Sequence, residues 1–210
     1  MPVAKKNIPI LNLDTQIDAD ASKQAGVSYA SFIGSDNLSA GQQAAQALMA
    51  AMGGHGDVAV LQGIAGEQNG INRLKGFTDE SQGKLNIVAT QPADYDQNLA
   101  LTVTGDLLRA HPTITGIFAA NDTMALGAFA AAKARGLSIP EELSVIGYDN
   151  SPLAKSRYLD MTSVDNRSDI VGSGVASALL ARIQDPALEP ERQLIEPDLI
   201  VRGTTARVPG

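Results

Sequence analysis

Five polar or aromatic side chains follow five successive apolar runs of the sequence. They are Arg73, Tyr95, Asn121, Asp149 and Asn166. A guanidinium group donates hydrogen bonds, a carboxylate accepts them, amides do both, and an aromatic ring can cover a C–H surface. Together these groups can satisfy several hydroxyls of a neutral polyol, which is the chemistry of a sugar site.

Each of these residues also has an ordinary structural interpretation. Asp149 is a common type of turn former, Tyr95 can be a packing aromatic, and Arg73 can be a solvated helix residue. Asn121 or Asp122 can simply cap the helix that follows them. Polar residues follow the apolar run at several predicted strand ends, and this recurrence favours a ligand-binding site. In that site we expect Asn121 to face the ligand while Asp122 caps the helix.

The alternation of apolar runs with helical patterns indicates which elements position these residues. Strands are expected at residues 57–63, 85–90, 114–120, 143–148 and 161–164, with helices between them. Strands that alternate with helices of ten or more residues pack as a parallel sheet covered on both faces. The predicted fold class is therefore α/β with a doubly wound parallel sheet, and the five residues follow its carboxyl ends along one rim.

The rest of the chain does not complete a second lobe of this kind. Two apolar runs, at residues 7–13 and 27–34, come first and bring no helix to cover them. A long amphipathic helix at 168–183 and a strand at 194–201 come last. We expect one complete lobe plus a partial second lobe.

Composition argues against several classes of function. The 210 residues are 44% hydrophobic and 19% charged, which is ordinary for a globular protein. A formal charge of −7 argues against binding to a phosphate backbone, so this segment is not expected to contact nucleic acid. The sequence contains no apolar stretch typical of an export signal or a membrane span, so no membrane contact is expected.

Signals for catalysis are weak. The chain has no Cys and only two His residues, His55 and His111, which we interpret as surface residues. Phosphate-binding, nucleophile-elbow, dinucleotide-binding and zinc-protease motifs are absent from the sequence. We therefore expect no metal site, no cofactor and no enzymatic activity.

Longer motifs resemble two related families. The stretches FIGSDN, LQGIAGEQNGINRLKGF, TQPADYD and FAANDTMALGA resemble periplasmic sugar-binding proteins of the ribose-binding type. LSIPEELSVIGYDNSPLA, MTSVDN and PDLIVRGTTAR resemble the effector-binding core of the lac/gal-repressor family, which shares that type I periplasmic-binding-protein fold. The resemblance covers nearly the whole chain and implies two doubly wound lobes, joined by three crossing strands, that close over a sugar.

The resemblance also implies site residues and lobe boundaries. It adds Asp14 to the five ligand-contacting positions, while Thr15 replaces an Arg that is common after this Asp and so counts against ribose itself. Hinge passages are implied near residues 35–36, 166–167 and 196–197. The implied segments are a remnant of the first lobe at 1–35, the complete ligand-binding lobe at 36–166, a helix and connection of the first lobe at 167–196, and a return strand and tail at 197–210.

Two functions follow from the resemblance. The leading interpretation is the sugar-sensing domain of a lac/gal-type transcription regulator, cytoplasmic and lacking its DNA-binding headpiece. The alternative is a fragment of an exported ribose-type sugar-binding protein of an ABC uptake system, periplasmic or extracellular if its parent carries a signal peptide. Because the units that normally open the first lobe are missing before Asn7, we expect weak sugar affinity. The unpaired strands could also join two chains as a homodimer.

Overall fold

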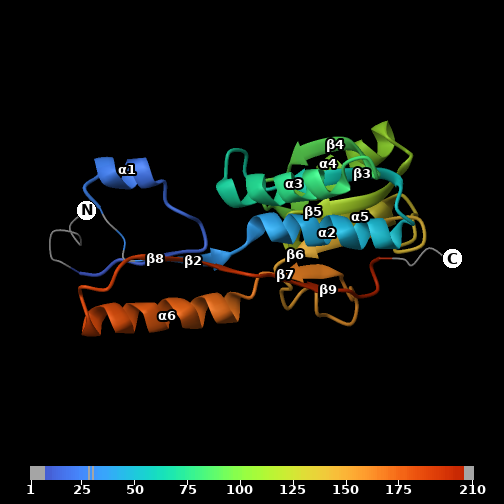
Figure 1. Cartoon of the computed structure of the whole chain (residues 1–210). Helices are drawn as coiled ribbons and strands as arrows, with labels where there is room; N and C mark the ends of the chain where they lie inside the picture. The colour runs from blue at the N-terminus through green and yellow to red at the C-terminus, as the bar shows by residue number, and fades with distance from the viewer. Residues whose placement is uncertain (1–7, 28, 30, 206–210) are drawn as a thin grey trace. The chain divides into compact units, whose positions relative to one another are not determined.

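The chain divides into two compact units. The computed structural model describes residues 8–27, 29 and 31–205. Unit 1 consists of Met1–Asp36 and Arg167–Glu196, and unit 2 consists of Asn37–Asn166 and Pro197–Gly210 (Figure 1). The chain therefore passes from one unit to the other three times. Asn7, at the start of the first predicted strand, lies outside the described residues, as do residues 28 and 30 of the second.

Unit 2 contains a six-stranded sheet in the order β4-β3-β5-β6-β7-β9. Its strands are β3 (Gly56–Gln62), β4 (Leu85–Pro92), β5 (Ile114–Ala119), β6 (Ser144–Tyr148), β7 (Ser163–Asp165) and β9 (Asp198–Ile200). The first five in this order pair in parallel, and β9 pairs antiparallel with β7. The five predicted parallel strands are confirmed.

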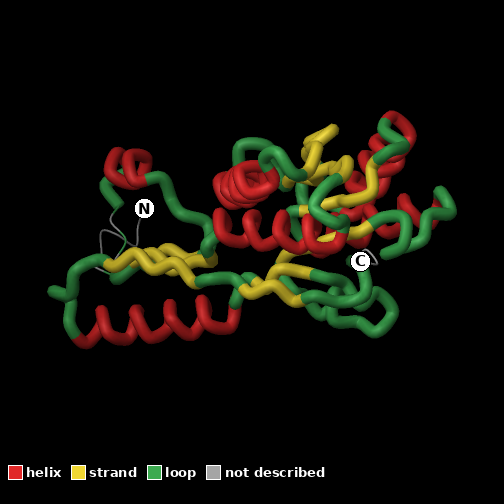
Figure 2. The backbone as a smooth tube through the Cα atoms, turned by 45° about the vertical axis from the view of Figure 1, so that its right-hand side comes forward, coloured by secondary structure: helices red, strands yellow, loops and turns green. Residues whose placement is uncertain are grey.

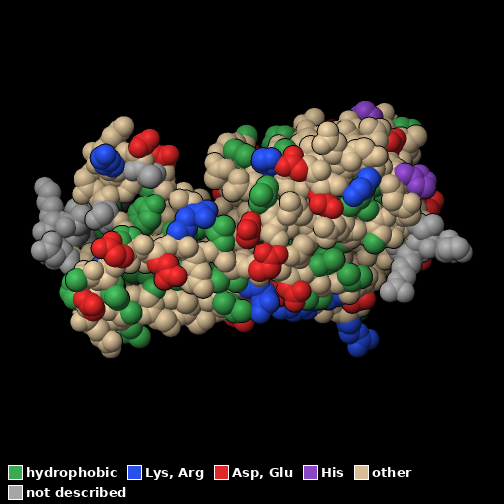
Figure 3. Space-filling model, viewed as in Figure 1, with side chains coloured by type: hydrophobic (Ala, Val, Ile, Leu, Met, Phe, Trp, Pro, Cys, Tyr) green, Lys and Arg blue, Asp and Glu red, His purple; other side chains and the backbone are tan. Residues whose placement is uncertain are grey.

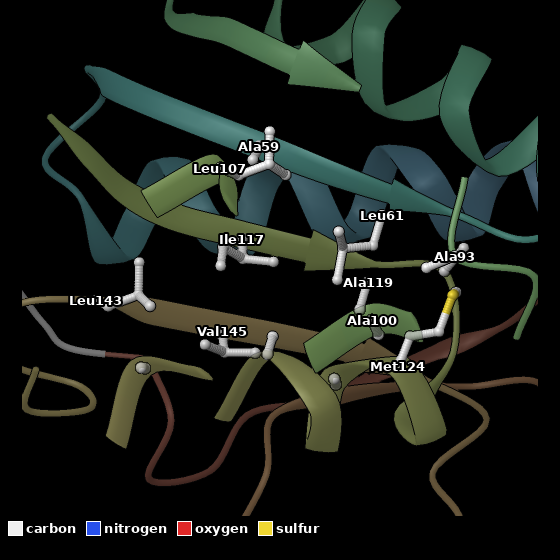
Figure 4. Packing of buried hydrophobic residues seen from close by; sticks show 14 of the residues in the cluster. Ala59, Leu61, Ala93, Ala100, Leu107, Ile117, Ala119, Met124, Leu143 and Val145 are labelled. Atoms are coloured by element: carbon white, nitrogen blue, oxygen red, sulfur yellow. The ribbon is translucent and has the colours of Figure 1, made fainter. Parts of the chain in front are cut away.

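Helices cover both faces of this sheet. They are α2 (Asn37–Ala51), α3 (Gln68–Ser81), α4 (Gln97–Ala110) and α5 (Asp122–Ala134). Successive side chains of a strand point to opposite faces, so Val58 and Val60 of β3 pack with α2 and α3, whereas Ala59 and Leu61 pack with α4 and α5. Figure 4 shows the second of these clusters, and Figure 2 shows helices on both sides of the strands. The predicted doubly wound α/β class is confirmed.

The strand order places a topological switch point between β3 and β5. From β3 the chain moves outward to β4 on one side, and it then returns to β5 and continues to β6 on the other. Loops leaving β3 and β5 therefore diverge at their carboxyl ends. In open α/β sheets such a point is where ligands bind.

Unit 1 is a three-stranded parallel sheet with two helices. It contains β1 (Asn12–Leu13), α1 (Ala19–Gln24), β2 (Ser31–Ser35), α6 (Ser168–Gln184) and β8 (Glu191–Ile195). The strand order is β1-β2-β8, and α6 packs against β2.

Three expectations for unit 1 and its connection are wrong. The segment before residue 36 does contain a helix, α1, because the Asp18 carboxylate accepts the Ala21 N–H and caps it. The strand expected at 194–201 is two strands, since Pro197 has no N–H to continue the ladder. Helix α6 is not amphipathic, because apolar Ile170, Leu180 and Ile183 are exposed to solvent.

Side chains of both charges are mixed on the visible surface of unit 2. Figure 3 shows acidic and basic groups next to one another on this face. Among the described residues, no helix combines the length and the hydropathy needed to cross a bilayer.

Candidate ligand-binding site at the strand ends of unit 2

Arg73 is held from three directions. It lies on α3 and is only 7% exposed, so the interpretation as a solvated helix residue is wrong. Its Nε donates to Asn37 Oδ1 at 2.7 Å, and an NH1 proton goes to the Ala120 carbonyl oxygen at 2.7 Å. Its guanidinium carbon lies 3.7 Å from the centre of the Tyr148 ring, a cation–π contact. The position of the guanidinium is thus fixed by α2, by the end of β5 and by β6.

The guanidinium still has donors to offer. Of its five N–H groups, one on Nε and one on NH1 are used by partners within the described residues. The Nη2 group makes no hydrogen bond to any described residue. It is also not one of the fully buried polar atoms that lack a partner in that part of the chain, so it is not closed off from solvent. Arg73 can therefore donate two or three hydrogen bonds to a group that arrives from outside.

Tyr95 is tied to the neighbouring strand-end loop. Its hydroxyl donates to Glu67 Oε2 at 2.8 Å, and Glu67 also accepts the N–H groups of Asn69 and Gly70, each at 2.8 Å, as the cap of α3. The end of the ring rests on Gly63, where any Cβ would collide with it. Tyr95 is partly buried and has a positive φ of 60°. The loops after β3 and β4 are thereby locked together.

The charges around Tyr95 reveal which groups are close. Burial raises the pKa of Tyr95 well above its usual value; the Arg73 charge opposes this shift, and the Glu67 and Asp149 charges add to it. Burial also raises the pKa of Glu67, but the N–H groups of Asn69 and Gly70, the Tyr95 hydroxyl and the Arg73 charge outweigh it. The net pKa of Glu67 is lowered. At neutral pH, Tyr95 is a phenol and Glu67 a carboxylate.

The roles expected of Asn121 and Asp122 must be corrected. Asn121 is the helix cap: its Oδ1 accepts the Met124 N–H at 2.8 Å. Asp122 is only 1% exposed and instead accepts hydrogen bonds from Ser151, in the loop after β6, and from Ser163 of β7. Local sequence rules allow either neighbour to cap, and the β backbone of Asn121, with φ −156° and ψ 167°, settles which one does. The Nδ2 group of Asn121 has no partner among the described residues and remains available.

Asp149 and Asn166 lie together at the ends of β6 and β7. Asn166 Nδ2 donates to Asp149 Oδ1 at 3.0 Å, and both residues are partly buried. Asp149 has a φ of 106° and Asn150 a φ of 48°, values that non-glycine residues seldom adopt. Asp149 thus combines a turn-forming backbone with a partly buried carboxylate.

The structure brings the five unit 2 residues together. Arg73 bonds to the residue before Asn121 and stacks on the residue before Asp149. Asp149 contacts Asn166, and its charge reaches Tyr95. Hydrogen bonds, a ring contact and charge interactions thus link the five residues, or the residues next to them, at the strand ends. These five residues are the connected set, and ligand contact by them stays a prediction.

Asp14 lies in the other unit. Its φ is 62°, its N–H donates to the Ile33 carbonyl at 3.0 Å, and its side chain is exposed. Buried Asn12 braces this turn by donating to the Thr15 carbonyl at 2.8 Å and accepting the Ile17 N–H at 2.7 Å. These hydrogen bonds hold the backbone turn that contains Asp14.

Sequence reasoning missed two residues that hold members of the connected set in place. Asn37 accepts hydrogen bonds from both Arg73 and the Tyr148 hydroxyl, the latter at 3.2 Å. Glu67 anchors Tyr95. An acidic residue just before a helix was a usable signal for Glu67 as a cap, but nothing local pointed from Asn37 to Arg73, 36 positions later.

Metal binding has no support in the described part of the chain. No group of three or more His, Asp or Glu residues there could hold a metal ion. His55 is exposed, and His111 is partly buried at the end of α4.

Known proteins resemble this chain over most of its length. The D-allose-binding periplasmic protein of Escherichia coli K12 is 35% identical over 185 residues, which is 83% of this chain and 59% of that protein. The HTH-type transcriptional regulator CelR of Thermobifida fusca is 30% identical over 82% of this chain and 51% of its own. The chain thus spans about half to three-fifths of the length of these relatives.

Solved structures share its fold. A periplasmic solute-binding protein of Actinobacillus succinogenes with bound D-allose superposes with a TM-score of 0.85 at 34% identity, covering 95% of this chain and 71% of that one. A LacI-family regulator of Enterococcus faecalis with bound ribose gives 0.84 at 28% identity, covering 99% and 72%. Both sugar-binding and regulatory proteins are therefore among its relatives, and the type I periplasmic-binding-protein fold is shown.

The family model described as "Periplasmic binding protein domain" matches residues 3–181. This match covers most of the chain and includes all six predicted site residues. The chain belongs to the periplasmic binding protein domain family.

Proposed function

We propose that this chain binds a neutral sugar, and that Arg73, Tyr95, Asn121, Asp149 and Asn166 contact it at the strand ends of unit 2, with Asp14 contributing from unit 1. The observation that carries the proposal is the buried guanidinium of Arg73, which is rigidly held and still has unused donors. A buried donor needs an acceptor, and sugar hydroxyls supply several.

The surrounding charges favour a neutral ligand over an anion. The positive charge of Arg73 is accompanied by the carboxylates of Glu67 and Asp149, which act on the same Tyr95 hydroxyl. An anionic group would meet those carboxylates, whereas a hydroxyl can donate to Asp149 and accept from Arg73 at once. The bound D-allose and ribose in two structural relatives support the same ligand class.

The test is a sugar titration of the whole 210-residue chain, followed by NMR chemical shifts so that millimolar affinities are measurable. D-allose, D-ribose, myo-inositol and cellobiose are suitable probes, because relatives bind them or are named for them. We expect at least one to shift resonances of the connected set. The proposal fails if none does.

Two substitutions then test individual contacts. Asp149→Asn keeps the side-chain size and tolerates the positive φ, and Asn121→Ser keeps the helix cap while removing the amide. Each should weaken binding by about 10- to 100-fold, the value of losing one or two charge-assisted or buried hydrogen bonds. Asp106→Asn, an exposed position on α4, is the control and should leave affinity unchanged. Unchanged affinity in both test variants would contradict the site.

For the physiological role we propose a ligand-sensing region of a lac/gal-type transcription regulator in the cytoplasm. The motif IPEELSVIGYDN and the similarity to CelR and to the ribose operon repressor of Halalkalibacterium halodurans support this role. In such a role, sugar binding shifts the population between conformations.

A specific observation favours a second role, that of an exported solute-binding component of a sugar uptake system. The relative with 35% identity is a periplasmic D-allose-binding protein. The coding sequence immediately upstream separates the two roles. A basic helix-turn-helix supports the regulator, and a signal peptide contradicts it in favour of the uptake component.

A further inference from the structure

The buried carboxylate of Asp122 is connected to the loop that carries Asp149. Its Oδ2 accepts the Ser151 N–H at 2.8 Å, and its Oδ1 accepts the Ser163 hydroxyl at 2.7 Å. Ser163 Oγ in turn accepts the Asn150 N–H at 2.9 Å. Asp122 therefore holds two successive amides after Asp149, one directly and one through a hydroxyl.

Those amides belong to a segment that needs to be held. Asp149 and Asn150 both have positive φ, which costs free energy for residues with a Cβ and persists only where surrounding contacts enforce it. The Asp149 N–H donates to the Val164 carbonyl at 2.9 Å, so β7 fixes the first residue of the segment.

The side chain of Asn150 is fixed as well. Its Nδ2 donates to Asp165 Oδ2 at 2.7 Å, and its Oδ1 accepts from Arg202 NH2 at 2.6 Å. Arg202 also donates to the Met161 carbonyl at 2.6 Å. The segment after β6 is thus held from β7, from α5 and from the segment that follows β9.

The capping of α5 does not explain why Asp122 is buried. Asn121 performs that role, and no cation lies within ion-pair distance of Asp122 among the described residues. Burial of a carboxylate is unfavourable, and it raises the pKa of Asp122 against the opposing effects of Ser163, Ser151 and the Arg202 charge. Gly147 of β6 makes room for this carboxylate, because a Cβ at that position would collide with Asp122 Oδ1.

We propose that Asp122 is a positioning residue for Asp149: by holding the amides of Asn150 and Ser151 it fixes the backbone that directs the Asp149 carboxylate toward Asn166 and the ligand. The ligand part of this inference rests on the proposed sugar binding. The positioning part is a property of the free protein and can be measured without a ligand.

The first experiment measures hydrogen exchange of individual amides by NMR in the whole chain. In Asp122→Ala the Asn150 and Ser151 amides should exchange at least about tenfold faster than in the wild type. The substitution removes the acceptor of the Ser151 N–H and the group that holds Ser163, the acceptor of the Asn150 N–H, so this segment opens more easily. Asp122→Asn can still accept from Ser151 and should restore slow exchange there. Ser163→Ala should release the Asn150 amide alone.

Leu108→Ala is the matched control, because it removes a buried apolar side chain of α4 that takes no part in the hydrogen bonds of Asn150 and Ser151. It should lower global stability without selective exposure of the two amides. Unchanged exchange of Asn150 and Ser151 in Asp122→Ala, or an equal change in Leu108→Ala, would overturn the proposal. If Asp122→Ala does not fold, Ser163→Ala decides the question at Asn150.

The second experiment is a double-mutant cycle on sugar affinity. Asp122→Ala should weaken binding by about tenfold in the wild type but by no more than about twofold in the Asp149→Asn background, since it acts through Asp149. Equal losses in both backgrounds would overturn the positioning role. If the wild type binds none of the sugars, the proposed function fails, and the exchange comparison still decides whether Asp122 positions Asp149.

Discussion

The bond between Tyr95 and Glu67 fixes two strand-end loops through two side chains. The tyrosine brings its ring to the site, and the carboxylate both caps α3 and receives the hydroxyl. The sequence indicated the aromatic ring, since PADYD follows an apolar run. It did not indicate the partner 28 residues earlier, because that pairing requires β3 and β4 to be neighbours.

Glu67 should make stability depend on pH in the acid range. Its pKa in the folded protein lies below the unfolded value of 4.5, so its stabilising effect is present above that pH and is lost as the pH falls through the folded value. Glu67→Gln removes this titration. The difference in unfolding free energy between wild type and variant, measured with urea from about pH 7 to about pH 3, should shrink below 4.5.

An exposed carboxylate supplies the control for this measurement. Glu189→Gln lies outside the site, on an exposed stretch of unit 1. It should change the unfolding free energy by no more than about 0.5 kcal/mol. A wild-type to Glu67→Gln difference that stays constant over the whole pH range would contradict the expectation.

At the scale of elements, glycines set how closely helices approach. A Cβ on Gly41 of α2 would collide with the Arg73 carbonyl, and a Cβ on Gly76 of α3 would collide with the Leu38 carbonyl. The two helices therefore touch backbone to backbone at the turn that carries Arg73. The sequence indicated both helices, whereas the mutual contact of these glycines depends on which faces meet.

Gly41→Ala should be destabilising, and its effect should extend to ligand binding. Added bulk at a backbone contact costs about 1–3 kcal/mol, and relief of the clash would displace α3 together with Arg73. Gly105→Ala on α4 is the matched control, since nothing lies within 4 Å of its added Cβ. It should be neutral or stabilising by roughly 0.4–1 kcal/mol in urea unfolding. Similar stability of the two variants would show that the helix contact is not tight.

At the scale of the whole molecule, unit 2 is assembled from two separate stretches of chain. Residues 197–205 return to it after the passage through unit 1, and they pair with β7 and reach β6. Thr204 Oγ1 donates to the Val145 carbonyl at 2.7 Å and accepts the Thr162 N–H at 2.9 Å. The returning stretch thereby secures the strands whose ends carry Asp149 and Asn166.

Thr204→Val should therefore weaken unit 2 as a whole. The substitution removes the hydroxyl that bonds to the Val145 carbonyl and to the Thr162 N–H, both of which are buried. We expect this loss to lower the unfolding free energy by about 1–3 kcal/mol. Thr102→Val is matched to it, because the Thr102 hydroxyl is exposed and donates only within its own helix, to Asn98. That control should change stability by no more than about 0.5 kcal/mol. Equal effects of both substitutions would mean that the returning stretch contributes little.

The sequence by itself determined the five parallel strands of unit 2, the helices between them and the residues that follow the strand ends. These features depend on hydrophobic periodicity and on helix caps, which act between residues near in sequence. Only the tertiary structure decided that Arg73 is buried against Asn37 and Tyr148, and that the Asp122 carboxylate bonds to Ser151 and Ser163. These outcomes depend on which strands become neighbours, because a buried polar group must take its partner from whatever the sheet order brings within hydrogen-bond distance.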